Sequence, residues 1–281
     1  KQAGNAAGNA VFSGSNPGGG VGLAWSATGN VKIIGDLSGS TNSAAVAVQL
    51  GSMRINAGSD VSITANTPSS GAAAIIMQYA GTGWNPAIKS GGNISILSNQ
   101  GSIALNNFDA ANTSTGLGIT GKNFTIDNTG GQWTDGVYTK GAGFSTSTAW
   151  QGVQLNGVAG SVVMTGNVTI FGNSQSNGGN AGVATSAGIK GATVQIDGAS
   201  KTSNGIYSGQ AIESTAGDVN ITGESKTSSA LSLQGDISAS NNVTIVGTNS
   251  EATNTTTTVL LTKAVTATQG TISITAETAG S

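Results

Sequence analysis

A short motif recurs nine times along the chain: one or two turn residues, an alternating strand and a small residue. Residues 29–35 read Gly-Asn-Val-Lys-Ile-Ile-Gly, and residues 217–223 read Gly-Asp-Val-Asn-Ile-Thr-Gly. The first apolar residues of the nine copies are Val31, Val61, Ile94, Phe124, Val168, Val194, Val219, Val243 and Ile272. Self-similarity at a period of this length is typical of proteins built from stacked structural repeats.

Composition separates an ordered repeat from a disordered chain. Only 8% of the 281 residues are charged and 45 are glycine, which on its own would suggest disorder. Yet 37% are hydrophobic, and the Val and Ile residues recur at regular spacing, which disordered segments lack. We therefore expect an ordered β protein.

Weaker strand patterns lie between the copies of the motif, at 46–51, 74–79, 116–120, 152–157, 230–235 and 259–261, with a short third strand at 52–57 and 235–239. Each period thus holds two or three short strands joined by Gly, Asn, Ser and Asp turns. The alternation directs apolar side chains inward and Ser, Thr, Asn or Lys outward. This pattern predicts an all-β fold, a parallel β-helix of about nine or ten rungs. A β-sandwich is the alternative, but it does not require one motif to recur with the same turn chemistry.

Charge and residue usage exclude several functions. The net charge is −2 with ten Lys and Arg residues, so we expect no nucleic-acid binding. The chain lacks His and Cys, the commonest general base and the thiol nucleophile. No apolar stretch approaches the length of a membrane helix, so we expect no membrane insertion. We expect residues 1–281 to form a single β-solenoid domain that is a fragment of a larger protein.

The combination of Gly-Asn/Asp-Val-x-Ile-Thr-Gly with Gly-Val/Ile-x-Leu-x-Gly and Ile-x-Ala resembles the repeats of filamentous-haemagglutinin-like exoproteins, the two-partner-secretion adhesins of Gram-negative bacteria. The resemblance covers nearly the whole chain and implies a right-handed parallel β-helix that is secreted or displayed on the bacterial cell surface. It implies cell adhesion or biofilm-matrix contact. The partners would be a polysaccharide or host-cell glycan, and adjacent β-helix segments of the parent chain or end-to-end copies.

The repeat is interrupted at 127–151, where two copies of the motif lie farthest apart. This irregular excursion contains Trp133, Tyr138, Phe144 and Trp150. Aromatic rings beside hydrogen-bonding groups suit the apolar face of a sugar, so we expect ligand binding by Trp133, Tyr138 and Trp150, with Trp84 from a separate turn. The alternative is that these rings pack over the rod and close its core.

Four asparagines at the starts of strands, Asn93, Asn123, Asn167 and Asn242, form Asn-x-Ser/Thr sequons and are candidates for glycosylation. The same positions also permit a second interpretation. Stacked Asn side chains on successive rungs can satisfy one another's polar groups as a ladder.

We expect no enzymatic activity, no cofactor and no metal. Solenoid lyases and hydrolases need clustered acidic residues, whereas the twelve here are scattered. Other functions remain open: a passive stalk of a contact-dependent inhibition toxin, a self-assembling filament, or ice binding by Thr arrays, of which 255–258 is the one local run.

Overall fold

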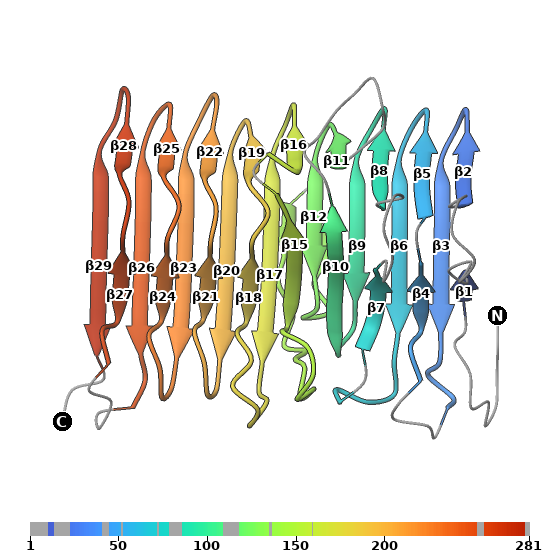
Figure 1. Cartoon of the computed structure of the whole chain (residues 1–281), viewed down its shortest axis with the longest axis horizontal. Coiled ribbons are helices and arrows are strands. Elements are labelled where there is room, and N and C mark those ends of the chain that lie inside the picture. The colour runs from blue at the N-terminus through green and yellow to red at the C-terminus, as the bar shows by residue number, and fades with distance from the viewer. Residues whose placement is uncertain are drawn as a thin grey trace.

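The computed structural model describes residues 11–13, 23–40, 45–51, 53–71, 73–78, 86–108, 118–134, 137–158, 160–251 and 256–278. Within these ranges every regular element is a strand. The strands form three nine-stranded parallel sheets and one two-stranded antiparallel hairpin (Figure 1). This part of the chain has no helix long and apolar enough to cross a membrane.

Each sheet takes one strand from every repeat. The first sheet contains β1 (Val11–Ser13), β4 (Val48–Leu50), β7 (Ala73–Met77), β10 (Ser102–Phe108), β15 (Val153–Gly157), β18 (Val183–Thr185), β21 (Ile206–Ser208), β24 (Leu231–Leu233) and β27 (Val259–Leu261). The second contains β2 (Leu23–Ala27), β5 (Met53–Ala57), β8 (Ala87–Ser90), β11 (Gly118–Gly121), β16 (Val162–Met164), β19 (Ile189–Gly191), β22 (Ile212–Ser214), β25 (Ile237–Ala239) and β28 (Val265–Ala267). The third contains β3 (Val31–Asp36), β6 (Val61–Asn66), β9 (Ile94–Ser98), β12 (Phe124–Asp127), β17 (Val168–Ser174), β20 (Val194–Ser200), β23 (Val219–Ser225), β26 (Val243–Asn249) and β29 (Ile272–Thr278). The hairpin consists of β13 (Gln132–Thr134) and β14 (Val137–Thr139).

Three consecutive strands, one from each sheet, make one turn of the chain, and nine such rungs stack along one axis. The first rung, β1 to β3, and the last, β27 to β29, lie at opposite ends of the stack (Figure 1). The predicted parallel β-helix is therefore confirmed.

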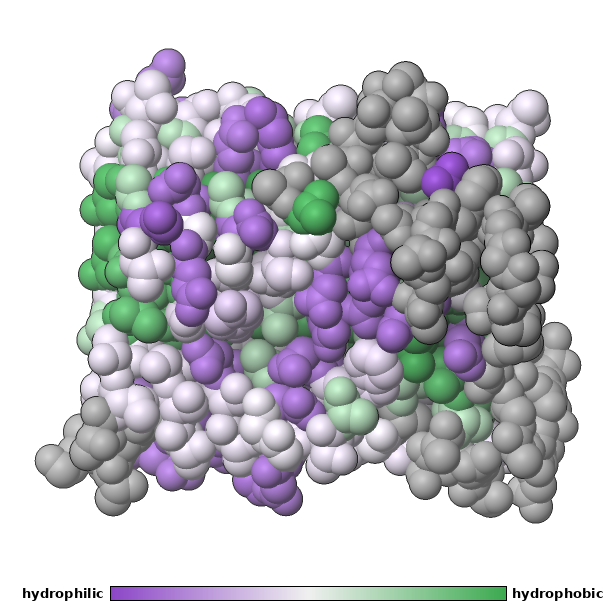
Figure 2. Space-filling model, viewed as in Figure 1, coloured by the Kyte–Doolittle hydropathy of each residue, from purple (hydrophilic) through white to green (hydrophobic). Residues whose placement is uncertain are grey.

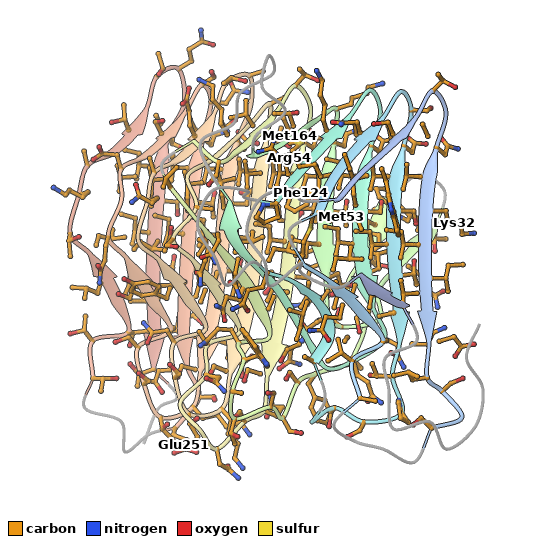
Figure 3. The ribbon with its side chains drawn as sticks, turned by 45° about the vertical axis from the view of Figure 1, so that its right-hand side comes forward. Lys32, Met53, Arg54, Phe124, Met164 and Glu251 are labelled. Carbon is orange, nitrogen blue, oxygen red and sulfur yellow. The ribbon has the colours of Figure 1, made fainter. Side chains whose placement is uncertain are left out.

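The nine copies of the motif form the third sheet in perfect register. Val31 pairs with Val61, Val61 with Ile94 and Ile94 with Phe124, and the ladder continues in the same way to Ile272. Burial alternates along β6 and β26 as the pleat requires. The large core side chains, among them Met53, Phe124 and Met164, lie between the sheets, whereas Lys32 points away from the stack (Figure 3).

One strand assignment from the sequence is wrong. The pattern at 116–120 predicts a strand equivalent to 46–51, but β11 pairs with β8 and β16 in the second sheet. The equivalent strand in that rung is β10, which pairs with β7 and β15. Both segments alternate in the same way, and alternation alone does not say to which sheet a short strand belongs.

The glycine that ends the motif has a packing reason. Gly172, Gly198, Gly223 and Gly247 pair in one row of the third sheet. A Cβ atom at Gly198 would collide with the carbonyl oxygen of Gly205, where the chain enters the first sheet of the next rung. At these four positions the narrow stack leaves no room for a side chain, whereas Ala276 continues the row in the last rung.

Candidate functional site

The excursion in the repeat begins at Asp127, where the chain leaves the third sheet and forms the β13–β14 hairpin. Trp133 and Tyr138 pair directly across this hairpin, and their ring centroids lie 5.0 Å apart with the planes tilted by 59°. On the other side Tyr138 stacks on Phe171, an outward-facing residue of β17, with centroids 5.9 Å apart and planes at 15°. The hairpin therefore lies against the outer face of the third sheet.

A buried carboxylate holds the start of the hairpin. Asp127 is fully buried, and its Oδ1 accepts a hydrogen bond from the Thr129 amide at 2.6 Å. Its Oδ2 accepts from the Gly131 amide at 2.9 Å and from the Tyr138 hydroxyl at 2.7 Å. Three donors on one carboxylate satisfy a group whose burial would otherwise be costly.

The same contact fixes the protonation of Tyr138. Burial of the phenol, its hydrogen bond to Asp127 and the negative charge of Asp127 all raise the pKa of Tyr138 above its ordinary value. The hydroxyl therefore stays protonated and continues to donate to Asp127 at any physiological pH.

An ion pair holds the end of the hairpin one rung farther along. Lys140 Nζ lies 2.6 Å from Asp197 Oδ2 on β20, with the lysine side chain about half exposed. Exposed pairs of this kind contribute little, roughly 0.2 to 1 kcal/mol. Asp127 and the stack on Phe171 are thus the main anchors, and Lys140 adds orientation.

A groove of about 380 Å³ lies between Trp133 and the third sheet. Three outward side chains from consecutive rungs line it: Ser62 of β6, Ser95 of β9 and Thr125 of β12. The Trp133 side chain borders the groove and is 54% exposed. Such a surface offers an aromatic face beside the partly exposed Ser62 and Ser95, whereas Thr125 is buried.

The upper lip of the groove comes from the turns that precede these strands: Asp60, Asn93 and Asn123. Asp60 Oδ1 accepts from the Asn93 amide at 2.7 Å, and Asn93 Oδ1 accepts from Asn123 Nδ2 at 2.7 Å. The ladder continues on the next rung, where the Asn167 amide donates to Asn123 Oδ1 at 2.8 Å. The lip is a hydrogen-bonded ladder with fixed side chains.

The four sequon asparagines all lie in this turn ladder. Asn167 Oδ1 accepts from Thr193 Oγ1, and farther along Asn242 Nδ2 donates to Asp218 Oδ1 while Asn242 Oδ1 accepts from the Thr271 amide. A glycan attached to Asn123 or Asn242 would use the nitrogen that now donates within the ladder. The structure contains the predicted ladder of hydrogen-bonded side chains, whereas glycosylation of these asparagines stays a prediction.

The structure separates the aromatic residues that the sequence grouped together. Trp133 borders the groove, and Tyr138 contacts both Trp133 and Phe171 of β17. Trp150 lies in the return segment 140–151, where its amide donates to Ser147 Oγ, and it is not among the residues that line the groove. In that segment Ser145 bridges Ser174 of β17, so the chain rejoins the stack there. Trp84 lies outside the described residues.

The floor of the groove is not among the residues predicted from the sequence, and its lip is predicted only in part. Ser62, Ser95 and Thr125 are the outward positions of three motif copies, so the alternation could have placed them on one face. Nothing in the pattern says that the hairpin folds over that face. Among the residues that the structure describes, no cluster of His, Cys, Asp and Glu could hold a metal ion.

Comparison with family models, with curated proteins and with solved structures gives no match to this chain.

Proposed function

We propose that this chain is a rigid rod segment of a secreted bacterial surface adhesin that contacts carbohydrate through the groove beside Trp133. The observation that carries the proposal is a half-exposed indole held over hydroxyl and amide side chains. Sugars bind to proteins in this way, since their C–H faces stack on aromatic rings while their hydroxyls form hydrogen bonds. The chain is a non-enzymatic binding protein in this proposal, with neither catalytic residues nor a cofactor.

The rod itself contributes stiffness. Rungs joined by continuous parallel ladders hold the groove at a fixed place on an extended body. A fibre that carries many such bodies binds a surface with an avidity far above the affinity of one site. This property, together with the resemblance of the repeats to those of secreted adhesins, supports contact with a host-cell glycan or a biofilm polysaccharide.

The first experiment is a glycan and bacterial-polysaccharide array probed with the wild-type chain, Trp133→Ala and Tyr207→Ala. Tyr207 is the matched control, because it is an exposed aromatic residue on β21 in the first sheet. We expect binding by the wild type and the control and its loss in Trp133→Ala. Absence of wild-type binding, or equal binding by all three proteins, would contradict the proposal.

A second candidate function is assembly of the last described rung with another β-helix segment, either of the parent chain or of a second copy. Ile272 and Ile274 are each 46% exposed, whereas Val243 and Ile245 at the same positions of the preceding rung are fully buried. Hydrophobic atoms line this end of the molecule, at the left of Figure 2. If the chain self-associates there, sedimentation velocity should show dimers that disappear in Ile272→Asp/Ile274→Asp. A concentration-independent monomer would exclude self-association.

A further inference from the structure

We propose that the groove selects a linear, uncharged glycan that lies along the rod axis, and that Asp60 confers this selectivity. The inference rests on the proposed function, since it names the class of saccharide and a specificity-determining residue of that site.

The direction follows from the register of the floor. Ser62 pairs with Ser95, and Ser95 pairs with Thr125, so the three hydroxyls follow one another along the axis. Neighbouring parallel strands lie about 4.8 Å apart. That spacing is close to the length of one hexose in an extended chain, so successive sugars can meet successive rungs.

The hairpin is anchored on the later rungs, beyond the floor of the groove. Trp133 rises from the hairpin, whose Tyr138 and Lys140 contact the two following rungs through Phe171 and Asp197. A glycan that follows the floor from the second rung to the fourth therefore meets the indole there. On the strand spacing the floor accommodates about three sugars, two of them over the partly exposed Ser62 and Ser95 and one against Trp133, since Thr125 is itself buried.

The charge of the groove comes from Asp60. Its carboxylate is partly exposed, and Oδ1 accepts the Asn93 amide while the described residues provide no donor for Oδ2. A carboxylate oxygen accepts strong hydrogen bonds from sugar hydroxyls. The same oxygen repels a uronate or a sulfate, and an unfavourable contact of this kind is an effective source of specificity.

The nearby cations do not reverse this preference. Lys32 lies on β3, one rung before Ser62, and points away from the stack (Figure 3). Lys122 precedes Asn123 in its turn, and neither lysine lines the groove. The remaining polar groups are hydroxyls and amides, each of which can donate and accept hydrogen bonds without carrying charge.

The experiment is isothermal titration of the chain with neutral cello-oligosaccharides and with oligogalacturonates of the same lengths. We expect the wild type to prefer the neutral series by about tenfold or more, with affinity rising up to a trimer and then levelling. Asp60→Asn keeps the Oδ1 acceptor for the Asn93 amide, so the ladder is preserved. This variant should bring the two series within about threefold of each other.

Lys32→Gln is the matched control, since it removes a charge one rung outside the groove. It should leave the preference unchanged. A wild type that prefers oligogalacturonate, a preference that survives Asp60→Asn in a folded variant, or one that depends on Lys32 would each overturn the inference. Absence of binding to both series and to every glycan on the array would instead overturn the proposed function.

Discussion

At the scale of single residues, contacts between atoms of neighbouring rungs explain why the motif has these residue types. Gly92 begins the third copy because the Asp60 carboxylate of the preceding rung occupies the space in which a methyl group would lie. Asn93 follows because its side-chain Oδ1 accepts a hydrogen bond from Asn123 Nδ2 of the next rung, while its backbone amide donates to the Asp60 carboxylate. The Gly-Asn/Asp pair is thus a contact between rungs as well as a turn.

This explanation predicts the effect of Gly92→Ala. The added methyl group collides with Asp60 Oδ1, so the variant should lose about 1 to 3 kcal/mol of unfolding free energy, as overpacked sites do. Gly29→Ala is the control at the equivalent turn of the first rung, where a Cβ atom meets nothing within 4 Å. Urea denaturation measures both. Equal losses in the two variants would contradict the account, and the loss at Gly92 should shrink in an Asp60→Ala background.

At the scale of elements, the hairpin is the feature that interrupts the regular rod, and its Trp133 borders the groove for which we propose glycan binding. Its position depends on the Asp127 carboxylate and on the stack of Tyr138 on Phe171. The sequence predicts that 127–151 departs from the repeat and that it is rich in aromatic residues. It does not predict the direction in which the chain leaves Asp127, because that depends on a hydroxyl eleven residues later reaching a buried carboxylate. For the same reason Trp133 and Trp150 could not be separated in advance.

Tyr138→Phe tests the anchor. The substitution keeps the ring stack but removes one of three donors to a buried carboxylate, which should cost about 1 to 3 kcal/mol. Amide hydrogen exchange should increase in β13 and β14 while the core strands stay protected. Lys140→Met, which removes only a half-exposed ion pair, should have a smaller effect. Unchanged exchange in Tyr138→Phe would show that the hydroxyl does not hold the hairpin.

The raised pKa of Tyr138 predicts an alkaline loss of stability. Because the folded-state pKa lies above the ordinary value of about 10, the stabilisation is fully present below pH 10 and is lost as pH rises toward the folded-state pKa. Denaturation midpoints between pH 8 and pH 11.5 should fall more steeply for the wild type than for Tyr138→Phe. Parallel curves for the two proteins would contradict this assignment.

At the scale of the whole molecule, the stack is a sum of similar rungs, each in contact with its neighbours. The sequence alone predicts the third sheet completely, since its nine strands carry one motif whose first apolar residues pair in register. The first and second sheets are less predictable, because three-residue strands such as β18 and β21 have too few positions to establish a period.

Stacking of this kind predicts that a whole rung can be removed. Deletion of 219–242 joins Asp218 to Val243, which pairs with Val219 and therefore replaces it. The shortened chain should fold, with slightly lower stability, and its groove should bind as before. Deletion of 219–230 breaks the register between rungs. Circular dichroism of this variant should show no cooperative unfolding transition. Equal tolerance of both deletions would contradict the rung-by-rung account.

The central claim, that this rod binds a glycan against Trp133, is tested most directly by the indole N–H signals of the four tryptophans in ¹⁵N NMR. Single Trp→Phe variants assign each signal, and a cello-oligosaccharide is then titrated. The account predicts a saturable shift of the Trp133 signal, with the Trp25 and Trp150 signals unchanged. A shift confined to Trp150 or Trp84, or no shift at saturating ligand, would contradict it.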